Sequence, residues 1–175
     1  MKKMSVQKLC INALMIALVC VTTAVIQIPI PLGYMHLGNV MILVAGVFFG
    51  PVTGLLAGGI GSALADLLTG FAVWVIPTLV IKSIMGYAIG RIAWGNAKTL
   101  QHNMLRIAIG NIIGIIIMVA GYTIFGSILY GSIAAGLEQV PGLVTEGILA
   151  IVVFYVVYAA MSAAKVTKGQ MNDIT

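Results

Sequence analysis

Three residues with chemically useful side chains recur at a fixed interval in the middle of the chain. Trp74, Thr78 and Lys82 are four residues apart, so on a helix an aromatic ring, a hydroxyl and an ammonium group share one stripe. A lysine at the centre of a membrane costs about 2.5 to 3.5 kcal/mol on insertion scales, so Lys82 requires a partner or a wet cavity. Two explanations stay open, and both can hold: a structural ion pair with Asp66, or a contact with a ligand.

Further polar side chains are expected around the same cavity. Tyr34 and His36 belong to a loop, and Asn39 opens the short apolar run that follows it. Tyr122 is expected near the outer end of a later helix. Glu146 falls in the first turns of the last helix, where the helix dipole favours an acid, and also at the depth of the cavity. Stabilisation of the helix and contact with a substrate are therefore both open for Glu146.

Signatures of catalysis, metal binding and nucleotide hydrolysis are absent from the sequence. His36 and His102 are expected on opposite sides of a membrane, and neither has a cysteine or second histidine at ligand spacing, so we predict no metal site and no cofactor. No G-x-x-x-x-G-K-[ST], H-E-x-x-H or G-x-S-x-G motif occurs. An intramembrane enzyme using Asp66, Glu146, His36 or Lys82 stays an alternative, although no nucleophile and base stand at helical spacing. The sequence favours a binding protein.

The composition places the whole chain in lipid. Of 175 residues, 61% are hydrophobic and 7% are charged, which leaves too little polar surface for a water-soluble fold. The apolar runs are far longer than the roughly 10 alternating residues of a barrel strand, so helices are expected. We predict one all-α transmembrane domain over residues 1–175. The net charge of +5 is scattered, with no basic patch among stacking aromatics, which argues against nucleic acid binding.

Six transmembrane helices are predicted, at about residues 9–28, 39–50, 51–69, 72–94, 104–125 and 142–164. The second helix is short, because at about 1.5 Å per residue it covers about 18 Å of a hydrocarbon core about 30 Å thick. The long outer loop before it, residues 30–38, must therefore dip into the membrane. Irregular backbone survives there only if protein covers it or if it lines a cavity.

The basic residues set the predicted orientation. Six crossings place both termini on one side, and eight of the nine basic residues fall on that side: Lys2, Lys3, Lys8, Arg91, Lys98, Arg106, Lys165 and Lys168. By the positive-inside rule this side is the cytoplasm. A five-span arrangement, with residues 40–68 as a re-entrant pair, would place Lys165 and Lys168 outside and is rejected. We predict a multi-pass protein of the bacterial inner membrane with both termini in the cytoplasm.

Small residues at helical spacing indicate where helices approach closely. Three glycine pairs favour packing inside the bundle: Gly54 with Gly58, Gly86 with Gly90, and Gly110 with Gly114. Another stripe follows the first helix through Ala13, Ala17, Cys20 and Ala24. For that stripe, an internal contact and a groove for a helix of another protein are both open. Asn111, closer to the cytoplasm, is expected to form a hydrogen bond between helices.

Two segments resemble a known family. The run HLGNVMILVAGVFFGPVTGLLAGGIGSALADLLTG and the later IPTLVIKSIMG are similar to the S components of energy-coupling factor (ECF) transporters. The likeness covers most of the chain, including the six helices, the long first loop before a short second helix, the G-P turn and the T-L-x-I-K segment. It implies a subunit that binds a vitamin from outside, beneath the first loop and between the fourth, fifth and sixth helices.

The resemblance also implies partners and site residues. A transmembrane coupling (T) component and two ATP-hydrolysing subunits would drive uptake, and the ALMIA segment from Ala13 to Ala17 is similar to the A-x-x-x-A motif that docks on the T component. The implied pocket consists of Tyr34, His36, Asn39, Trp74, Thr78, Lys82, Tyr122 and Glu146. The hydroxymethylpyrimidine or pyridoxine type is most similar, with riboflavin and pantothenate types as alternatives. A purely structural membrane subunit is the remaining alternative.

Overall fold

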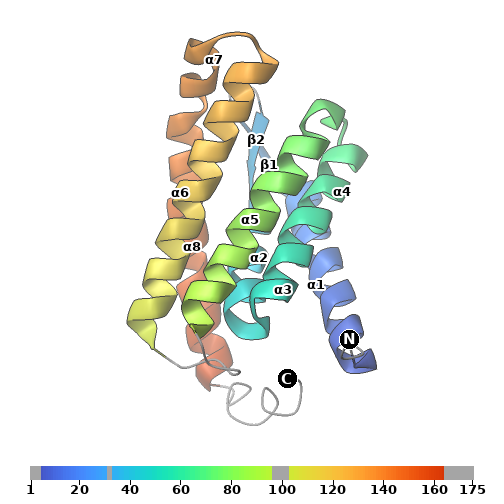
Figure 1. The fold of residues 1–175 in the computed structure, drawn as a ribbon, viewed down its shortest axis with the longest axis vertical. Helices are drawn as coiled ribbons and strands as arrows, with labels where there is room; N and C mark the ends of the chain where they lie inside the picture. The colour runs from blue at the N-terminus through green and yellow to red at the C-terminus, as the bar shows by residue number, and fades with distance from the viewer. Residues whose placement is uncertain (1–4, 31–32, 96–102, 164–175) are drawn as a thin grey trace.

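Long apolar runs form helices because a helix satisfies its backbone polar groups within one segment. The computed structural model describes residues 5–30, 33–95 and 103–163. Its elements are α1 (Val6–Val25), β1 (Gln27–Ile30), β2 (Gly33–His36), α2 (Gly38–Phe49), α3 (Pro51–Leu56), the π-helix η1 (Ala57–Gly61), α4 (Ser62–Leu68), the 3-10 turn η2 (Ala72–Trp74), α5 (Val75–Trp94), α6 (Met104–Leu129), α7 (Ile133–Glu138) and α8 (Val140–Ala163). In Figure 1, α1 begins and α8 ends at one end of the bundle, called here the terminal end; α7 and the turn into α5 lie at the other, the hairpin end.

Within the described residues, five helical segments are long and apolar enough to cross a membrane: Val6–Val25, Pro51–Leu68, Ala72–Trp94, Met104–Leu129 and Ile133–Ser162. The predicted short helix is also present, because Gly38–Phe49 is apolar and has 12 residues. The predicted multi-pass helical membrane protein is therefore confirmed. The number of six crossings and the cytoplasmic position of both termini stay predictions.

Three of the basic residues that set the predicted orientation lie within the described residues. Lys8 lies in the first turn of α1, Arg91 in the last turn of α5 and Arg106 in the first turn of α6, all toward the terminal end. The five other basic residues of that set, Lys2, Lys3, Lys98, Lys165 and Lys168, lie outside the described residues.

The first loop is more regular than predicted. α1 ends at Val25, before the predicted end at residue 28, and β1 and β2 then pair as an antiparallel hairpin with Gln27 opposite His36. Pro29 explains the early end, because proline lacks a backbone donor and favours extended backbone before it. The paired strands satisfy each other's backbone groups, so the segment can lie among helices. The all-α class is thus corrected to a helical bundle with one short hairpin.

Two further boundaries differ from the predicted ones. α6 continues to Leu129, beyond the predicted end at residue 125, and the next six-residue helix, α7, was not predicted. The chain turns between them at Gly131, whose φ of 65° is unfavourable for other residues. α8 begins at Val140, two residues before the predicted start. The earlier start places Gln139, the residue before α8, at a cavity between the helices.

Glycines allow α5 to contact the backbones of α2 and α3 directly. A Cβ on Gly54 would collide with the backbone of Gly86, and a Cβ on Gly58 would collide with the carbonyl group of Lys82. The same lack of room holds for the other members of the predicted pairs, Gly90, Gly110 and Gly114. Their predicted packing inside the bundle is confirmed. It brings Lys82 and its helix close to the π-helical turn η1.

Aromatic side chains fill the core toward the terminal end. The ring of Phe48 lies 6.4 Å from that of Phe154 and 5.5 Å from that of Tyr158, measured between centroids. The indole N–H of Trp94 donates to the backbone carbonyl oxygen of Val47 at 2.8 Å. This part of the bundle is apolar and closely packed.

Asn111 differs from its prediction. Its side chain is fully buried on α6, yet neither its amide nitrogen nor its amide oxygen has a hydrogen-bond partner among the described residues. The expected bond between helices is therefore absent. The physical reason is its surroundings: Ile107 and Met118 share its buried face of α6, and the adjoining core is apolar.

Candidate functional site

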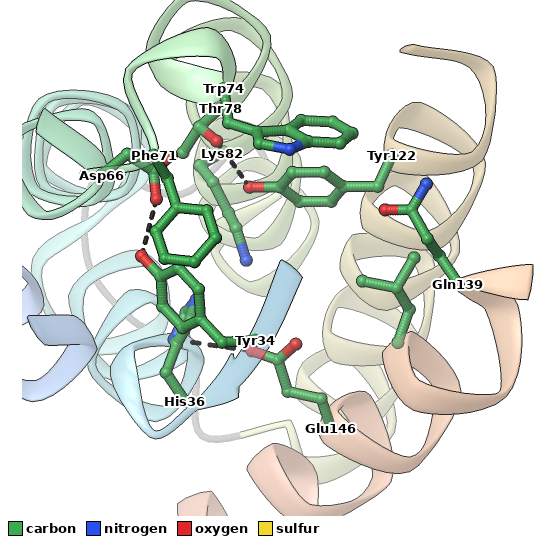
Figure 2. A pocket seen from close by; sticks show the side chains of 11 residues that line it. Tyr34, His36, Asp66, Phe71, Trp74, Thr78, Lys82, Tyr122, Gln139 and Glu146 are labelled. Carbon is green, nitrogen blue, oxygen red and sulfur yellow. Dashed lines mark hydrogen bonds and ion pairs between the residues drawn. The ribbon is translucent and has the colours of Figure 1, made fainter. Parts of the chain in front are cut away.

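A cavity lies between the hairpin and the helices toward the hairpin end of the bundle (Figure 2). It is lined by Tyr34, His36, Asp66, Phe71, Trp74, Thr78, Lys82, Tyr122, Gln139, Leu143 and Glu146. The space open to the centres of water molecules is about 40 Å³, which is room for a few waters. A ligand containing an aromatic ring would therefore have to move some of these side chains apart.

The stripe predicted along the fourth apolar segment faces this cavity. Trp74 ends the turn η2, and Thr78 and Lys82 follow on α5, so helical spacing aligns their side chains. All three are at least 95% buried, with exposed fractions of 5%, 2% and 1%. The ammonium group of Lys82 is thus enclosed by protein and does not reach a membrane surface.

Asn39 links Lys82 to Glu146. The ammonium group of Lys82 donates to the amide oxygen of Asn39 at 2.5 Å, and the amide nitrogen of Asn39 donates to the Glu146 carboxyl group at 2.7 Å. Lys82 Nζ also lies 3.2 Å from the sulfur of Met118 and 5.3 Å from the centroid of the Tyr122 ring. The cation and the anion are therefore compensated through one carboxamide, which offsets part of their desolvation.

The structural ion pair considered between Lys82 and Asp66 is not formed in the described part of the chain. Asp66 instead accepts a hydrogen bond from the Tyr34 hydroxyl group at 2.6 Å. The Tyr34 ring also packs against Phe71, with 4.6 Å between centroids. Burial, and then the neighbouring carboxylate of Asp66, raise the pKa of Tyr34, so its hydroxyl group stays protonated and donates. These contacts connect the hairpin to the end of α4.

His36 connects the hairpin to α8. Its Nδ1 accepts a hydrogen bond from the backbone N–H of Gly38 at 3.1 Å and lies 3.5 Å from the Glu146 carboxyl group. Burial, and then the charge of Lys82, hold the pKa of His36 well below its usual value. The imidazole is therefore neutral, with its proton on Nε2, because Nδ1 is already an acceptor.

Aromatic rings form the wall between these polar groups. The ring centroids of Trp74 and Tyr122 are 5.5 Å apart, and the Tyr122 hydroxyl group lies 2.9 Å from the hydroxyl group of Thr78. Tyr130, near the end of α6, also packs against Trp74, with 6.2 Å between ring centroids. The arrangement offers flat apolar faces with hydrogen-bonding groups at their edges, which is typical of a site for a small aromatic ligand.

The predicted site residues are brought together, with one difference. All of them line the cavity except Asn39, which is fully buried behind Lys82 and Glu146 and connects them. The sequence prediction missed four lining residues: Asp66 as a site residue, Phe71, Gln139 and Leu143. Gln139, Leu143 and Glu146 have the i, i+4, i+7 spacing of one helix face, which would have identified two of them had α8 been extended toward its start.

The central residues of the small-residue stripe on α1 do not pack inside the protein. Ala13 and Ala17 are exposed, and Cys20 and Ala24 are partly buried. The buried face of α1 is a different one, formed by Asn12, Met15, Val19 and Thr23. Ala13 and Ala17 are therefore free of contacts that would prevent a helix from packing on them.

No group of three or more His, Cys, Asp and Glu residues suited to a metal ion occurs in residues 5–30, 33–95 and 103–163. His102, the second histidine of the sequence argument, lies outside these residues. The acidic and basic side chains that line the cavity, His36, Asp66, Lys82 and Glu146, all contact other side chains or the backbone. What the arrangement can do is bind a small polar aromatic molecule out of contact with lipid.

The sequence matches known proteins along most of its length. Residues 3–163 match the family described as "ECF-type riboflavin transporter, S component". A protein from Pyrococcus woesei, described as "Uncharacterized protein in gap 3'region", is 44% identical over 115 residues, which cover 65% of this chain and 74% of that protein. The chain belongs to the S-component family of ECF transporters, the membrane-embedded substrate-binding subunits of these importers, and this family is not one of enzymes.

Proposed function

We propose that this S component captures a small single-ring heteroaromatic vitamin or vitamin precursor, of the hydroxymethylpyrimidine or pyridoxine type, for ATP-driven uptake by partner subunits. The observation that carries the proposal is the cavity itself. Aromatic faces of Trp74 and Tyr122 stand opposite Tyr34 and Phe71, so a flat ring can be held between them. Polar groups at the edges of these faces can bind its substituents.

The size of the cavity supports a single ring. Only about 40 Å³ is open to the centres of water molecules, so even one ring requires an outward movement of lining side chains. Tyr34 and Phe71 are the side chains placed to make that movement, because they belong to the hairpin and to a turn, and the helices are held by backbone contacts. A three-ring ligand such as riboflavin would require a larger rearrangement. Riboflavin remains the second candidate because the matching family is described by that substrate.

The polar residues support a ligand with hydroxyl or hydroxymethyl substituents. Lys82, Glu146 and His36 meet at one side of the cavity, and they can donate to and accept from such groups. Because Lys82 and Glu146 already compensate each other through Asn39, an uncharged substituent can bind there without leaving an unpaired ion.

The proposed partners are a T component and two ATP-hydrolysing subunits. The sequence contains no P-loop, so the energy must come from elsewhere. The exposed Ala13 and Ala17 form a surface on which a helix of the T component can approach the α1 backbone closely. With the terminal end on the cytoplasmic side of a bacterial plasma membrane, as the positive-inside rule predicts, the cavity would face the exterior.

Binding by the purified chain tests this proposal. We expect detergent-solubilised protein, with no partner present, to bind radiolabelled hydroxymethylpyrimidine or pyridoxine at micromolar concentration or below. Uptake into vesicles should require the partner subunits and ATP. Riboflavin and pantothenate serve as the comparison ligands, and tight binding of riboflavin alone would select the second candidate. Monodisperse, folded protein that binds none of the four vitamins would refute the proposal.

A further inference from the structure

Three buried polar atoms of residues that line the cavity have no hydrogen-bond partner within the part of the chain that the structure describes. They are the second carboxylate oxygen of Asp66, the indole nitrogen of Trp74 and the amide nitrogen of Gln139. The three residues are 6%, 5% and 3% exposed, respectively. A buried polar group without a partner is destabilising, so each of these atoms favours a bound molecule that supplies one.

The three atoms differ in what they require. A carboxylate oxygen accepts hydrogen bonds, whereas the indole N–H and the amide NH₂ group donate them. Figure 2 shows Asp66 and Gln139 on opposite sides of the cavity, with Trp74 and Tyr122 between them. The protein thus presents an acceptor at one side of the cavity and the indole donor of Trp74 beside the aromatic rings, whereas the amide nitrogen of Gln139 lies against Gly126. A flat ligand that fits has a hydrogen-bond donor at one edge and an acceptor at another.

The charges around the cavity indicate which kind of hydrogen-bond donor the ligand carries. Lys82 is compensated by Glu146 through Asn39, and His36 is neutral because its Nδ1 accepts from a backbone N–H group. Asp66 accepts a hydrogen bond from the uncharged Tyr34 hydroxyl group, and the uncharged Thr78 hydroxyl group also interacts with its carboxyl group. One carboxylate of the cavity therefore lacks a cation that is in contact with it.

We infer that Asp66 selects ligands that bring a nitrogen-bound hydrogen, from an amino substituent or a protonated ring nitrogen, and that the indole N–H of Trp74 donates to an acceptor on the same ring. The inference rests on the proposed function and narrows its substrate class. Asp66 is then a specificity-determining residue, although Lys82 is the more conspicuous charge in the sequence. Aromatic compounds of the same shape that lack the N–H donor are rejected, because the carboxylate would be left without a partner.

Matched ligand pairs test the inference on the unmodified protein. One pair is 4-amino-5-hydroxymethyl-2-methylpyrimidine and the compound with a methyl group in place of its amino group. The other is pyridoxine and the benzene analogue with a C–H group in place of the ring nitrogen. For whichever parent compound binds, we expect the donor-free analogue to bind about 10- to 150-fold more weakly, as for one charge-assisted hydrogen bond. Equal affinity of both members of the pair would overturn the inference.

The variant Asp66→Asn tests whether this carboxyl group causes the discrimination between the parent compound and its donor-free analogue. The variant should bind both members of the pair with similar affinity, because it loses the charge and retains the shape of the side chain. Ser62→Ala is the matched control, since Ser62 is also buried on α4 and its hydroxyl group has no partner, but it does not line the cavity. It should retain the full discrimination. Unchanged discrimination in folded Asp66→Asn would overturn the inference.

A second variant keeps the test decisive if Asp66→Asn does not fold. Trp74→Phe removes the indole N–H and keeps an aromatic ring, so it should weaken binding of the parent compound. It should not weaken binding of an analogue in which the hydroxymethyl group is replaced by methyl. An equal loss for both compounds would overturn the assignment of the acceptor. If no compound of either pair binds the unmodified protein, the proposed function itself fails, which is a different result from binding without discrimination.

Discussion

The two tryptophans of the chain lie at opposite ends of α5 and differ in their hydrogen bonding. Trp94, at the terminal end, donates its indole N–H to the Val47 carbonyl oxygen at 2.8 Å. Trp74, at the hairpin end, is also buried, but its indole N–H has no hydrogen-bond partner in the described residues, and the ring lines the cavity. The comparison contrasts an indole N–H that is hydrogen-bonded within the protein with one that has no partner among the described residues and lies at a cavity.

The difference follows from what surrounds each ring. Gly50 has a φ of 91°, which allows the turn between α2 and α3 to lie directly against the Trp94 ring. Around Trp74, side chains that are long, aromatic or charged meet from several elements and leave space between them. The glycine turn thus packs directly on Trp94, whereas the side chains around Trp74 leave a small cavity.

The largest effect is expected from Lys82→Met, which removes the cation at the base of the cavity. Glu146 would then be a buried carboxyl group without its compensating charge. We expect the free energy of unfolding to fall by about 3 to 5 kcal/mol and ligand binding to be lost. Thermal unfolding in detergent measures the loss. The double variant Lys82→Met with Glu146→Gln should recover part of the stability, whereas Lys8→Met at the start of α1 should have little effect. If Lys82→Met alone were as stable as the double variant, the link between Lys82 and Glu146 would be contradicted.

Gly86→Leu tests the packed half of the comparison. Its side chain would collide with the backbone of Gly54, so overpacking should destabilise the protein by about 3 kcal/mol or lead to aggregation. Ile84→Ala on the same helix is the control, because Ile84 is 52% exposed and faces away from the bundle. Melting temperature and size-exclusion profile give the result. A normal melting temperature for Gly86→Leu would show that α3 and α5 can separate. This result would contradict the close packing of the two helices.

A smaller effect is expected from Tyr34→Phe, which removes the hydrogen bond between the hairpin and Asp66. The loss should be about 1 to 3 kcal/mol, because a buried acceptor oxygen of Asp66 would lose its partner. Amide hydrogen exchange should become faster in residues 27–30 and 33–36, and ligand dissociation should accelerate. Tyr130→Phe provides a matched control, since Tyr130 is 43% exposed. Unchanged exchange in the hairpin would mean that other contacts hold it in place.

The neutral state of His36 predicts a dependence of stability on pH. Burial lowers the pKa of His36 in the folded protein, so the unfolded chain binds more protons as the pH falls below about 6.5. Stability contributed by His36 is therefore present above this pH and decreases below it. His36→Gln should show a flatter dependence between pH 7 and pH 5, measured by thermal unfolding. Parallel curves for the two proteins would contradict a neutral, buried His36.

The smallest effect on the isolated protein is expected from Ala13→Leu combined with Ala17→Leu. Both alanines are exposed, so stability should change by less than about 0.5 kcal/mol and ligand affinity should be unaltered. Uptake with the partner subunits should nevertheless be lost, because leucine side chains would keep another helix at a distance. Ile116→Leu, on a residue that is 59% exposed on α6, should leave uptake intact. Normal uptake by the double variant would exclude this face as the docking surface.

Several features of the site could be predicted from the sequence because they depend on helical spacing within one segment. Trp74, Thr78 and Lys82 face the cavity as their spacing predicts, and the glycine pairs lie inside the bundle. The partner of Lys82 could not be predicted in this way. Asp66 was considered for that role, but the residue that binds Lys82 is Asn39, 43 positions earlier in the chain.

The sequence by itself determined the solvent of this protein, its helical class and the stripe of chemically useful residues, because composition and periodicity are local properties of the chain. Only the tertiary structure decided that Asn39 bridges Lys82 and Glu146, that Tyr34 contacts Asp66, and that Trp74 is left without a hydrogen-bond partner. These outcomes depend on how closely helices approach and on how the hairpin folds between them. Such distances are set by packing between residues far apart in sequence, which no spacing within a single segment can specify.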